Sequence, residues 1–140
     1  MISPGDRIFV DTGAFIALTV RTDAHHAAAA SLWRELVVQG GRPLTSVPVV
    51  IEAYTYLQRN LGGDLAEGWR AALVATPRLT ILECSAADLA VSWPWLRRRD
   101  MHKLSVVDAT SFVLMKKHKL RRAFTFDARF AAAGFKLLPS

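Results

Sequence analysis

Four acidic residues of this 140-residue chain stand where its hydrophobic pattern changes, and small or hydroxyl-bearing residues flank each of them. Asp11 and Asp127 each close a short run rich in apolar residues, as expected at the end of a buried strand. Glu52 and Asp108 each lie near the start of a stretch with helical spacing. Carboxylates in such places converge when a parallel sheet forms, so the four are candidates for one site.

The chemistry of four converging carboxylates is that of a cation site. Two carboxylates about 5 Å apart repel by roughly 3 kcal/mol at an effective dielectric constant near 20. Carboxylate oxygens suit Mg²⁺ or Mn²⁺, and a cation held by them can activate water beside a phosphate. The chain offers no competing nucleophile, because Cys84 has no base beside it in sequence and there is no glycine-rich phosphate loop. The acids therefore predict phosphodiester hydrolysis.

The elements that must position these acids alternate between short apolar strands and longer helices. This alternation indicates βαβ units, and we expect a three-layer α/β/α fold with a central, mainly parallel sheet of four to five strands. The expected strands are 8–10, 43–45, 79–82, 123–126 and 135–138. The expected helices are 12–19, 25–39, 47–60, 64 to about 76, one from 85 that Pro94 kinks or ends, 105–117 and 127–133.

Other acidic residues have the patterns of helix starts rather than of ligands. Asp23 is expected to cap the helix 25–39, and Asp64 has capping-box spacing with Glu67. Ser85 is expected to begin the next helix in the chain. We therefore expect none of these acids to bind a metal.

Each candidate acid has a structural alternative when it is taken alone. Asp127 could cap the helix that follows it, and Asp108 ends a capping pattern that begins at Ser105. Glu52 could belong to a solvated polar stripe on its helix. Asp11 is the hardest to explain in this way. Four independent alternatives would have to place every acid at the same edge, so their joint occurrence favours a shared site.

The overall composition describes one globular domain, residues 1–140, with a strongly basic charge balance. The chain is 51% hydrophobic and 21% charged, with a net charge of +6 and a pI of about 10.1. We expect no membrane association, because no apolar stretch is long enough to span a bilayer and no secretion signal is visible. Cys84 is the only cysteine, which fits the cytoplasmic location that we expect.

Half of the 18 basic residues fall into two clusters on either side of Asp108. The first cluster comprises Arg97, Arg98, Arg99 and Lys103, and the second comprises Lys116, Lys117, Lys119, Arg121 and Arg122. A basic rim around an acidic centre suits a phosphate backbone, and the first cluster is a candidate nucleic-acid contact. The second cluster has an alternative role, because cations are also favourable at a helix C-terminus.

At these residues the chain resembles the PIN-domain family and, within it, the VapC-type toxins of bacterial toxin–antitoxin pairs. The resemblance rests on four stretches in the same order and spacing: 9–15, 45–52, 104–109 and 123–135. Each stretch is short and unspecific alone, whereas the ordered set is specific and covers almost the whole chain.

The resemblance implies roles for particular residues. Asp11 and Asp108 match the positions that hold Mg²⁺ or Mn²⁺ most directly, and Glu52 and Asp127 match those that complete the site. Three small polar residues match positions that support the acids or a bound water: Thr12, Ser105 and Thr125.

The resulting hypothesis is a metal-dependent endoribonuclease that acts as the toxin of a toxin–antitoxin pair. The family cleaves single-stranded RNA, often in loops of transfer or ribosomal RNA. Its VapC-type members usually dimerise and are silenced by a small antitoxin, so we expect a homodimer and an antitoxin partner. Two alternatives stay open: a PIN nuclease of RNA processing without a toxin role, and a non-catalytic RNA-binding module.

Overall fold

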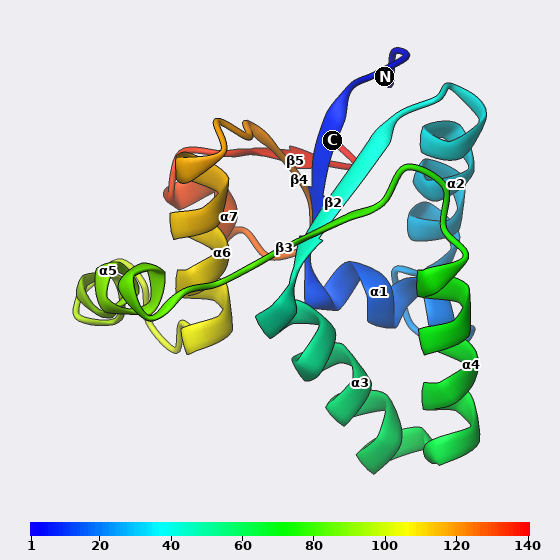
Figure 1. Ribbon diagram of the computed structural model, residues 1–140, viewed down its shortest axis with the longest axis horizontal. Helices are drawn as coiled ribbons and strands as arrows, with labels where there is room; N and C mark the ends of the chain where they lie inside the picture. Colours follow the sequence, from blue (N-terminus) through cyan, green and yellow to red (C-terminus); the bar gives the residue numbers. More distant parts are fainter.

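The computed structural model describes residues 1–140 and contains a five-stranded parallel sheet with helices on both faces (Figure 1). The strands are β1 (Arg7–Val10), β2 (Arg42–Ser46), β3 (Thr80–Leu82), β4 (Arg122–Phe124) and β5 (Lys136–Leu138). Their order in the sheet is β3-β2-β1-β4-β5, and every neighbouring pair is parallel. The predicted α/β/α class and strand number are confirmed.

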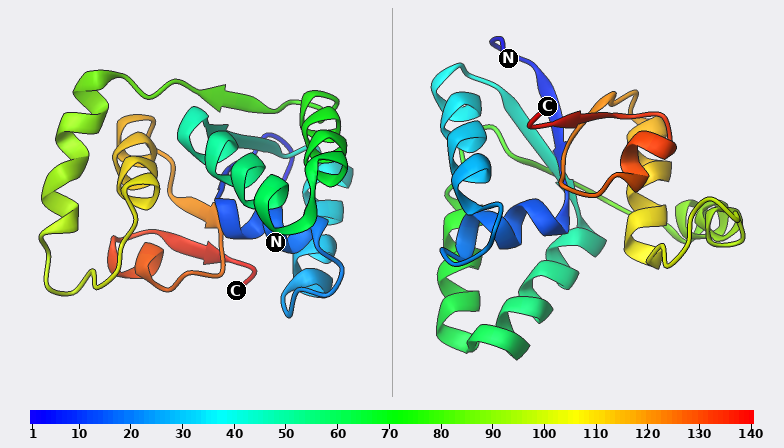
Figure 2. Two further views of the ribbon diagram at one scale, coloured as in Figure 1. Left: turned by 90° about the horizontal axis from the view of Figure 1, so that it is seen from below. Right: turned by 180° about the vertical axis from the view of Figure 1, so that it is seen from behind.

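Seven helices surround the sheet, and they begin and end within two residues of the predicted ranges. They are α1 (Thr12–Thr19), α2 (His26–Val38), α3 (Val47–Leu61), α4 (Gly63–Val74), α5 (Ala86–Leu96), α6 (Val106–Lys117) and α7 (Arg129–Ala132). The helices α1, α2 and α4 lie on one side of the sheet and α5, α6 and α7 on the other (Figures 1 and 2). None of the helices is both long and apolar enough to cross a membrane.

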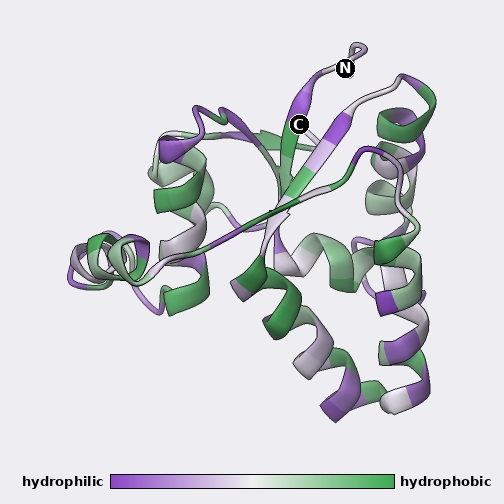
Figure 3. Ribbon diagram, in the orientation of Figure 1, coloured by the Kyte–Doolittle hydropathy of each residue, from purple (hydrophilic) through white to green (hydrophobic).

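The core is built around β1, which is a central strand with helices on both faces. Ile8, Phe9 and Val10 have no exposed surface, which explains why this strand is a continuous apolar run rather than an alternating one. Thirty buried hydrophobic residues form one cluster that extends from Ile2 to Leu138. The polarity of α3 changes along its length, with hydrophobic first turns and a hydrophilic far end (Figure 3).

Two of the predicted helix starts are wrong in detail. Asp23 does not cap α2, because the cap position is His25, and the Asp23 carboxylate instead accepts a hydrogen bond from the His25 backbone N–H at 2.8 Å. Asp64 and Glu67 form no capping box. Gly62, with a φ of 100°, forms the turn between α3 and α4. As a result α4 begins at Gly63, before Asp64.

Other helix starts follow their local sequence. Ser85 and Asp88 form a reciprocal capping box, with hydrogen bonds of 3.1 and 2.9 Å, and Asp88 also pairs with Lys117 of α6 at 3.0 Å. Ser46 caps α3, and its hydroxyl accepts a hydrogen bond from a backbone N–H in the first turn. Pro94 lies inside α5, close to the end of this helix. These local signals fix where α3 and α5 begin.

The strand order places a topological switch point beside β1. The chain runs from β1 through β2 to β3 at one edge of the sheet, and then returns to β4 and β5 on the other side of β1. Open parallel sheets bind ligands at the carboxyl ends of the strands beside such a reversal. Asp11 directly follows β1, and its backbone N–H donates to the Phe124 carbonyl at the end of β4, at 3.0 Å.

Candidate active site

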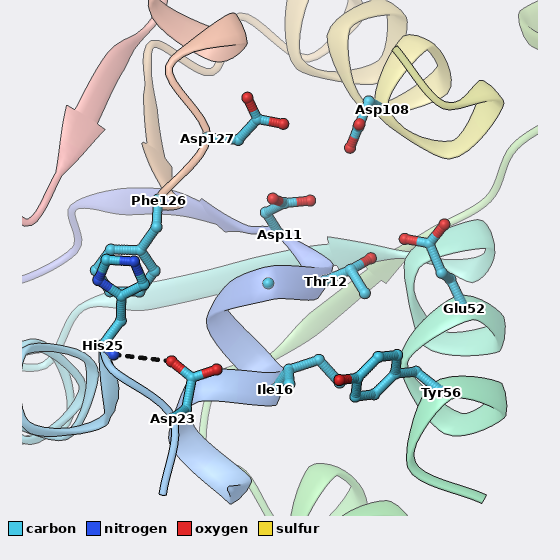
Figure 4. Close-up of a pocket in the computed structure, with 11 residues that line it drawn as sticks. Asp11, Thr12, Ile16, Asp23, His25, Glu52, Tyr56, Asp108, Phe126 and Asp127 are labelled. Carbon is cyan, nitrogen blue, oxygen red and sulfur yellow. Dashed lines mark hydrogen bonds between the residues drawn. The ribbon is translucent and has the colours of Figure 1, made fainter. Parts of the chain in front are cut away.

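The four predicted acids line one cavity of about 510 Å³ at the carboxyl ends of β1 and β4. Asp11 precedes α1, Glu52 lies on α3, Asp108 on α6, and Asp127 in the loop after β4. Their carboxylates point toward a common space (Figure 4). The fold therefore brings together acids from four distant parts of the chain.

Asp11 lies deepest in the site, with 4% of its surface exposed. Its Oδ2 accepts a hydrogen bond from Thr125 Oγ1 at 2.9 Å. Its Oδ1 has no hydrogen-bond partner, and neither has the buried hydroxyl of Thr12. Asp11 therefore presents a hydrogen-bond acceptor without a donor at the cavity. Burying such an oxygen without a partner is energetically unfavourable.

Burial and neighbouring carboxylates raise the pKa of both Asp11 and Asp108. Burial, and after it the charge of Asp108, raises the pKa of Asp11 from 3.8 to about 7. Burial is also the main cause that raises the pKa of Asp108, with smaller contributions from Asp127 and Glu52, while hydrogen bonding from Ser105 opposes it. The site therefore carries an excess of negative charge that a cation would relieve.

Ser105 places Asp108 through the backbone. Its hydroxyl caps α6 by accepting a hydrogen bond from the Asp108 N–H at 3.0 Å. The Asp108 carboxylate lines the cavity rather than completing a capping box. The capping alternative thus accounts for the backbone of Asp108 but not for its side chain.

Thr125 connects two of the acids. It is 1% exposed, and its hydroxyl donates to Asp11 while accepting a hydrogen bond from the Asp127 backbone N–H at 3.1 Å. Because a hydroxyl has one proton and two lone pairs, these two bonds fix the direction in which it donates. The predicted supporting residue Thr125 thus donates a hydrogen bond to Asp11, whereas the hydroxyl of Thr12 has no hydrogen-bond partner.

Asp127 differs from the other acids because it has a charged partner. Arg129 contacts its carboxylate through Nε at 3.0 Å and through Nη2 at 2.9 Å. The Arg129 backbone N–H also donates to Asp127 Oδ1 at 2.9 Å, but the cap position of α7 is Ala128, so Asp127 does not cap this helix. Arg129 Nη1 reaches the His102 carbonyl at 3.0 Å and so ties the loop between α5 and α6 to the site.

Glu52 is half-buried on the second turn of α3. It lines a neighbouring groove together with Thr55 and Arg59, but apolar residues such as Ile51 and Val107 line this groove as well. Its carboxylate nevertheless points toward the other acids, and its charge contributes to the raised pKa of Asp108 (Figure 4). Glu52 thus lies beside polar residues of its own helix and also at the cavity of the acids.

The donor set fits a hard divalent cation that keeps part of its water shell. Asp11 supplies a buried oxygen without a donor, close to the charge of Asp108. No group of three or more His, Cys, Asp or Glu side chains is arranged to hold a metal ion by itself. Mg²⁺ is usually bound by one or two carboxylates together with waters and substrate phosphates, so this arrangement suits it. The metal-binding role of the acids stays a prediction.

Sequence reasoning missed several residues of the site. Arg129 was not singled out, although an arginine two positions after an acid is a readable signal. Six further residues line the cavity without having been predicted: Gly13, Ile16, Asp23, His25, Tyr56 and Phe126. They come from α1, from the turn before α2, from α3 and from the loop after β4. Their presence depends on strand order, which local patterns do not encode.

The first basic cluster lies at the end of α5 and in the loop that follows it. Arg97, Arg99 and Lys103 are exposed, whereas Arg98 forms an ion pair with Asp100. RNA contact by this cluster stays a prediction.

Comparison with known proteins identifies the fold family. The family model of the PIN domain matches residues 8–136. The chain belongs to the PIN-domain family. This PIN domain is 39% identical over 132 residues to the 23S rRNA-specific endonuclease VapC20 of two Mycobacterium tuberculosis strains, CDC 1551 and H37Rv, covering 91% of this chain and 95% of VapC20. The predicted resemblance to VapC-type toxins is confirmed.

Solved structures agree with this assignment. Mycobacterium tuberculosis VapC20, described as a sarcin–ricin loop cleaving toxin, superposes with a TM-score of 0.81 at 36% identity, covering 91% of this chain and 95% of VapC20. DNA-bound VapBC from Salmonella typhimurium gives 0.67 at 12% identity, covering 94% and 96%. FitAcB from Neisseria gonorrhoeae gives 0.66 at 18%, covering 93% and 95%. The last two likenesses show the shared fold alone.

The raised pKa of Asp11 predicts that Asp11→Asn stabilises the metal-free protein. The folded-state pKa of about 7 exceeds 3.8, so the ionised carboxylate destabilises the fold increasingly from about pH 4 to 7, and fully above that. Each pH unit between the two pKa values is worth about 1.4 kcal/mol, so the gain is at most about 4 kcal/mol. We expect a higher Tm for Asp11→Asn in EDTA at pH 8, and a smaller gain at pH 5.

The matched control is Asp64→Asn, which changes an exposed acid on α4. Its effect on Tm should be small and similar at both pH values. A gain for Asp11→Asn that does not shrink toward pH 5 would contradict the assignment of the raised pKa to Asp11.

Proposed function

We propose that this protein is a metal-dependent, VapC-type endoribonuclease that acts as the toxin of a toxin–antitoxin pair. The observation that carries the proposal is the cavity in which the unpaired oxygen of Asp11 lies with the carboxylates of Asp108, Glu52 and Asp127. Similarity to VapC20, which is an endonuclease specific for 23S rRNA, supports the same class of reaction.

Asp11 and Asp108 would hold a Mg²⁺ or Mn²⁺ ion, and Glu52 and Asp127 would complete the site directly or through water. When bound, the ion would supply Lewis acidity and lower the pKa of a water for attack on phosphorus. Two hydrogen bonds of this chain would position the acids for the ion. Thr125 engages one oxygen of Asp11 and leaves the other without a protein donor. Ser105 holds the backbone of Asp108 at the start of α6.

The proposed substrate is an RNA loop, with ribosomal RNA first and transfer RNA second. The net charge of +6 favours a polyanion, and exposed Arg97, Arg99 and Lys103 would contact phosphates. VapC20 acts on the sarcin–ricin loop, which makes this loop the first candidate to test.

A partner surface for a second copy or an antitoxin would include the apolar start of α3. Val47, Ile51 and Val106 are 41%, 61% and 39% exposed, and they line one groove between α3 and α6. Exposed apolar grooves of this kind are typical of protein interaction sites. A homodimer and a small antitoxin are therefore part of the proposal.

The cleavage experiment uses a hairpin RNA with the sarcin–ricin loop sequence of 23S rRNA. We expect the wild type to cut it with Mg²⁺ or Mn²⁺ but not in EDTA. Asp11→Asn should lower the rate at least about 100-fold, because a metal contributes several kcal/mol and each 1.4 kcal/mol is about tenfold. Asp64→Asn is the control and should cut normally. Equal cleavage by Asp11→Asn and the wild type would sink the proposed site, and an uncut hairpin would redirect the assay to total RNA.

The toxin role predicts that the wild-type protein arrests growth when its expression is induced in bacteria. Asp11→Asn should be harmless at the same expression level, because it would lack the nuclease activity. Growth curves and immunoblots of the two cultures measure this. If the culture grows normally although the wild-type protein is expressed and active, a nuclease of RNA processing is favoured instead.

The basic loop predicts salt-dependent RNA binding. In the Asp11→Asn background, replacing Arg97 and Arg99 by alanine should weaken hairpin binding and reduce the slope of log K against log salt by about 1 to 2. The matched control replaces Arg42 and Lys136, two exposed basic residues at the amino ends of β2 and β5, away from the site. An equal change in slope for both pairs would argue against a specific role of the loop.

A further inference from the structure

One wall of the acidic cavity is aromatic. His25 and Phe126 both line the cavity, and their rings stack nearly parallel, with centroids 4.3 Å apart and an interplanar angle of 10° (Figure 4). His25 is an exposed residue, whereas Phe126 is half-buried. The phenyl ring therefore forms the inner layer of the stack and the imidazole its outer layer.

The segment that carries His25 is held in place by its neighbours. The Asp23 carboxylate accepts a hydrogen bond from the His25 backbone N–H at 2.8 Å. Next along the chain, His26 Nδ1 lies 2.7 Å from the Ala17 carbonyl oxygen and donates to it, which ties the segment to α1. An aromatic surface that is already ordered loses little freedom when a ligand stacks on it.

Phe126 connects this wall to the reaction centre. Its ring packs edge-on against the buried ring of Phe124, at 6.2 Å between centroids, so the core supports it from behind. The residues on either side of it are Thr125, which holds Asp11, and Asp127. A flat group stacked here would therefore lie next to the acids.

We propose that the His25–Phe126 stack is a platform for an unpaired nucleobase next to the scissile phosphate. The proposal rests on the proposed ribonuclease function and adds a subsite to it. A base stacks on any aromatic face, whereas a paired base inside a helix has no free face to offer. The platform thus selects RNA in which a base beside the cut is unstacked, as in a loop. His25 is a positioning and specificity residue here, rather than a proton donor.

The first test compares the hairpin cleavage of His25→Ala, His25→Phe and the wild type. Alanine should lower kcat/KM about 5- to 150-fold, the range that alanine substitution at base-stacking residues produces. Phenylalanine keeps the flat surface but has no ring nitrogen, so it should restore most of the activity. The control is His118→Ala, at the far end of α6 from the site, which should cut normally. If His25→Phe is as impaired as His25→Ala, the stacking role is overturned.

A second test removes the base instead of the side chain. Hairpins with an abasic nucleotide on the 5′ or the 3′ side of the cut should be poorer substrates in one of the two positions. On that hairpin, His25→Ala should cause no further loss, because the stacking partner is already missing. If the loss of cleavage caused by His25→Ala is the same on both abasic hairpins as on the intact hairpin, the proposal is overturned. A merely structural role of His25 gives that result.

Binding separates failure of this inference from failure of the proposed function. A hairpin with 2-aminopurine at the sensitive position should lose fluorescence with Asp11→Asn, and not with Asp11→Asn combined with His25→Ala. If the fluorescence quenching depends on His25 but the wild type does not cleave the hairpin, the platform is supported and the nuclease function is rejected. Cleavage that is unaffected by His25→Ala would keep the nuclease and discard the platform.

Discussion

The buried carboxylate of Asp11 is the constraint on which the site depends. Removing a carboxylate from water is expensive unless its charge and lone pairs are matched, and here only one oxygen has a side-chain donor, Thr125. The nearby Asp108 adds repulsion rather than compensation. The group stays buried because β1 is paired on both sides, and the Asp11 N–H is bonded to the end of β4. The sheet thus imposes a charge imbalance at a defined point.

The acids divide into two kinds according to their partners. Asp127 has its own cation in Arg129, which also holds the loop between α5 and α6 through the His102 carbonyl. Asp11 and Asp108 have no such cation, and burial is the main cause of the raised pKa of both. The part of the site that needs an external positive charge is therefore this pair. Arg129 joins the same electrostatic network, because Asp127, Asp108 and Asp11 all contribute to raising its pKa.

Strand order explains why the reaction centre and its rim have different origins. The acids follow β1 and β4 or begin helices, so the sheet fixes them at the topological switch point. Part of the rim comes from a surface segment, since the turn before α2 brings His25, whereas Tyr56 lies on the same helix as Glu52. Rigid elements can hold the chemistry constant while such segments set which substrates fit.

The sequence by itself determined the alternation of strands and helices, the place of Asp11 at a strand end and the cap that Ser105 gives to α6, because these depend on neighbours within a few residues. Only the tertiary structure decided that acids from four distant parts of the chain line one cavity, and that His25 stacks on Phe126, a residue far along the chain. Periodicity fixes which face of an element is apolar. Strand order fixes what that face meets, and strand order follows from packing the whole chain around one core.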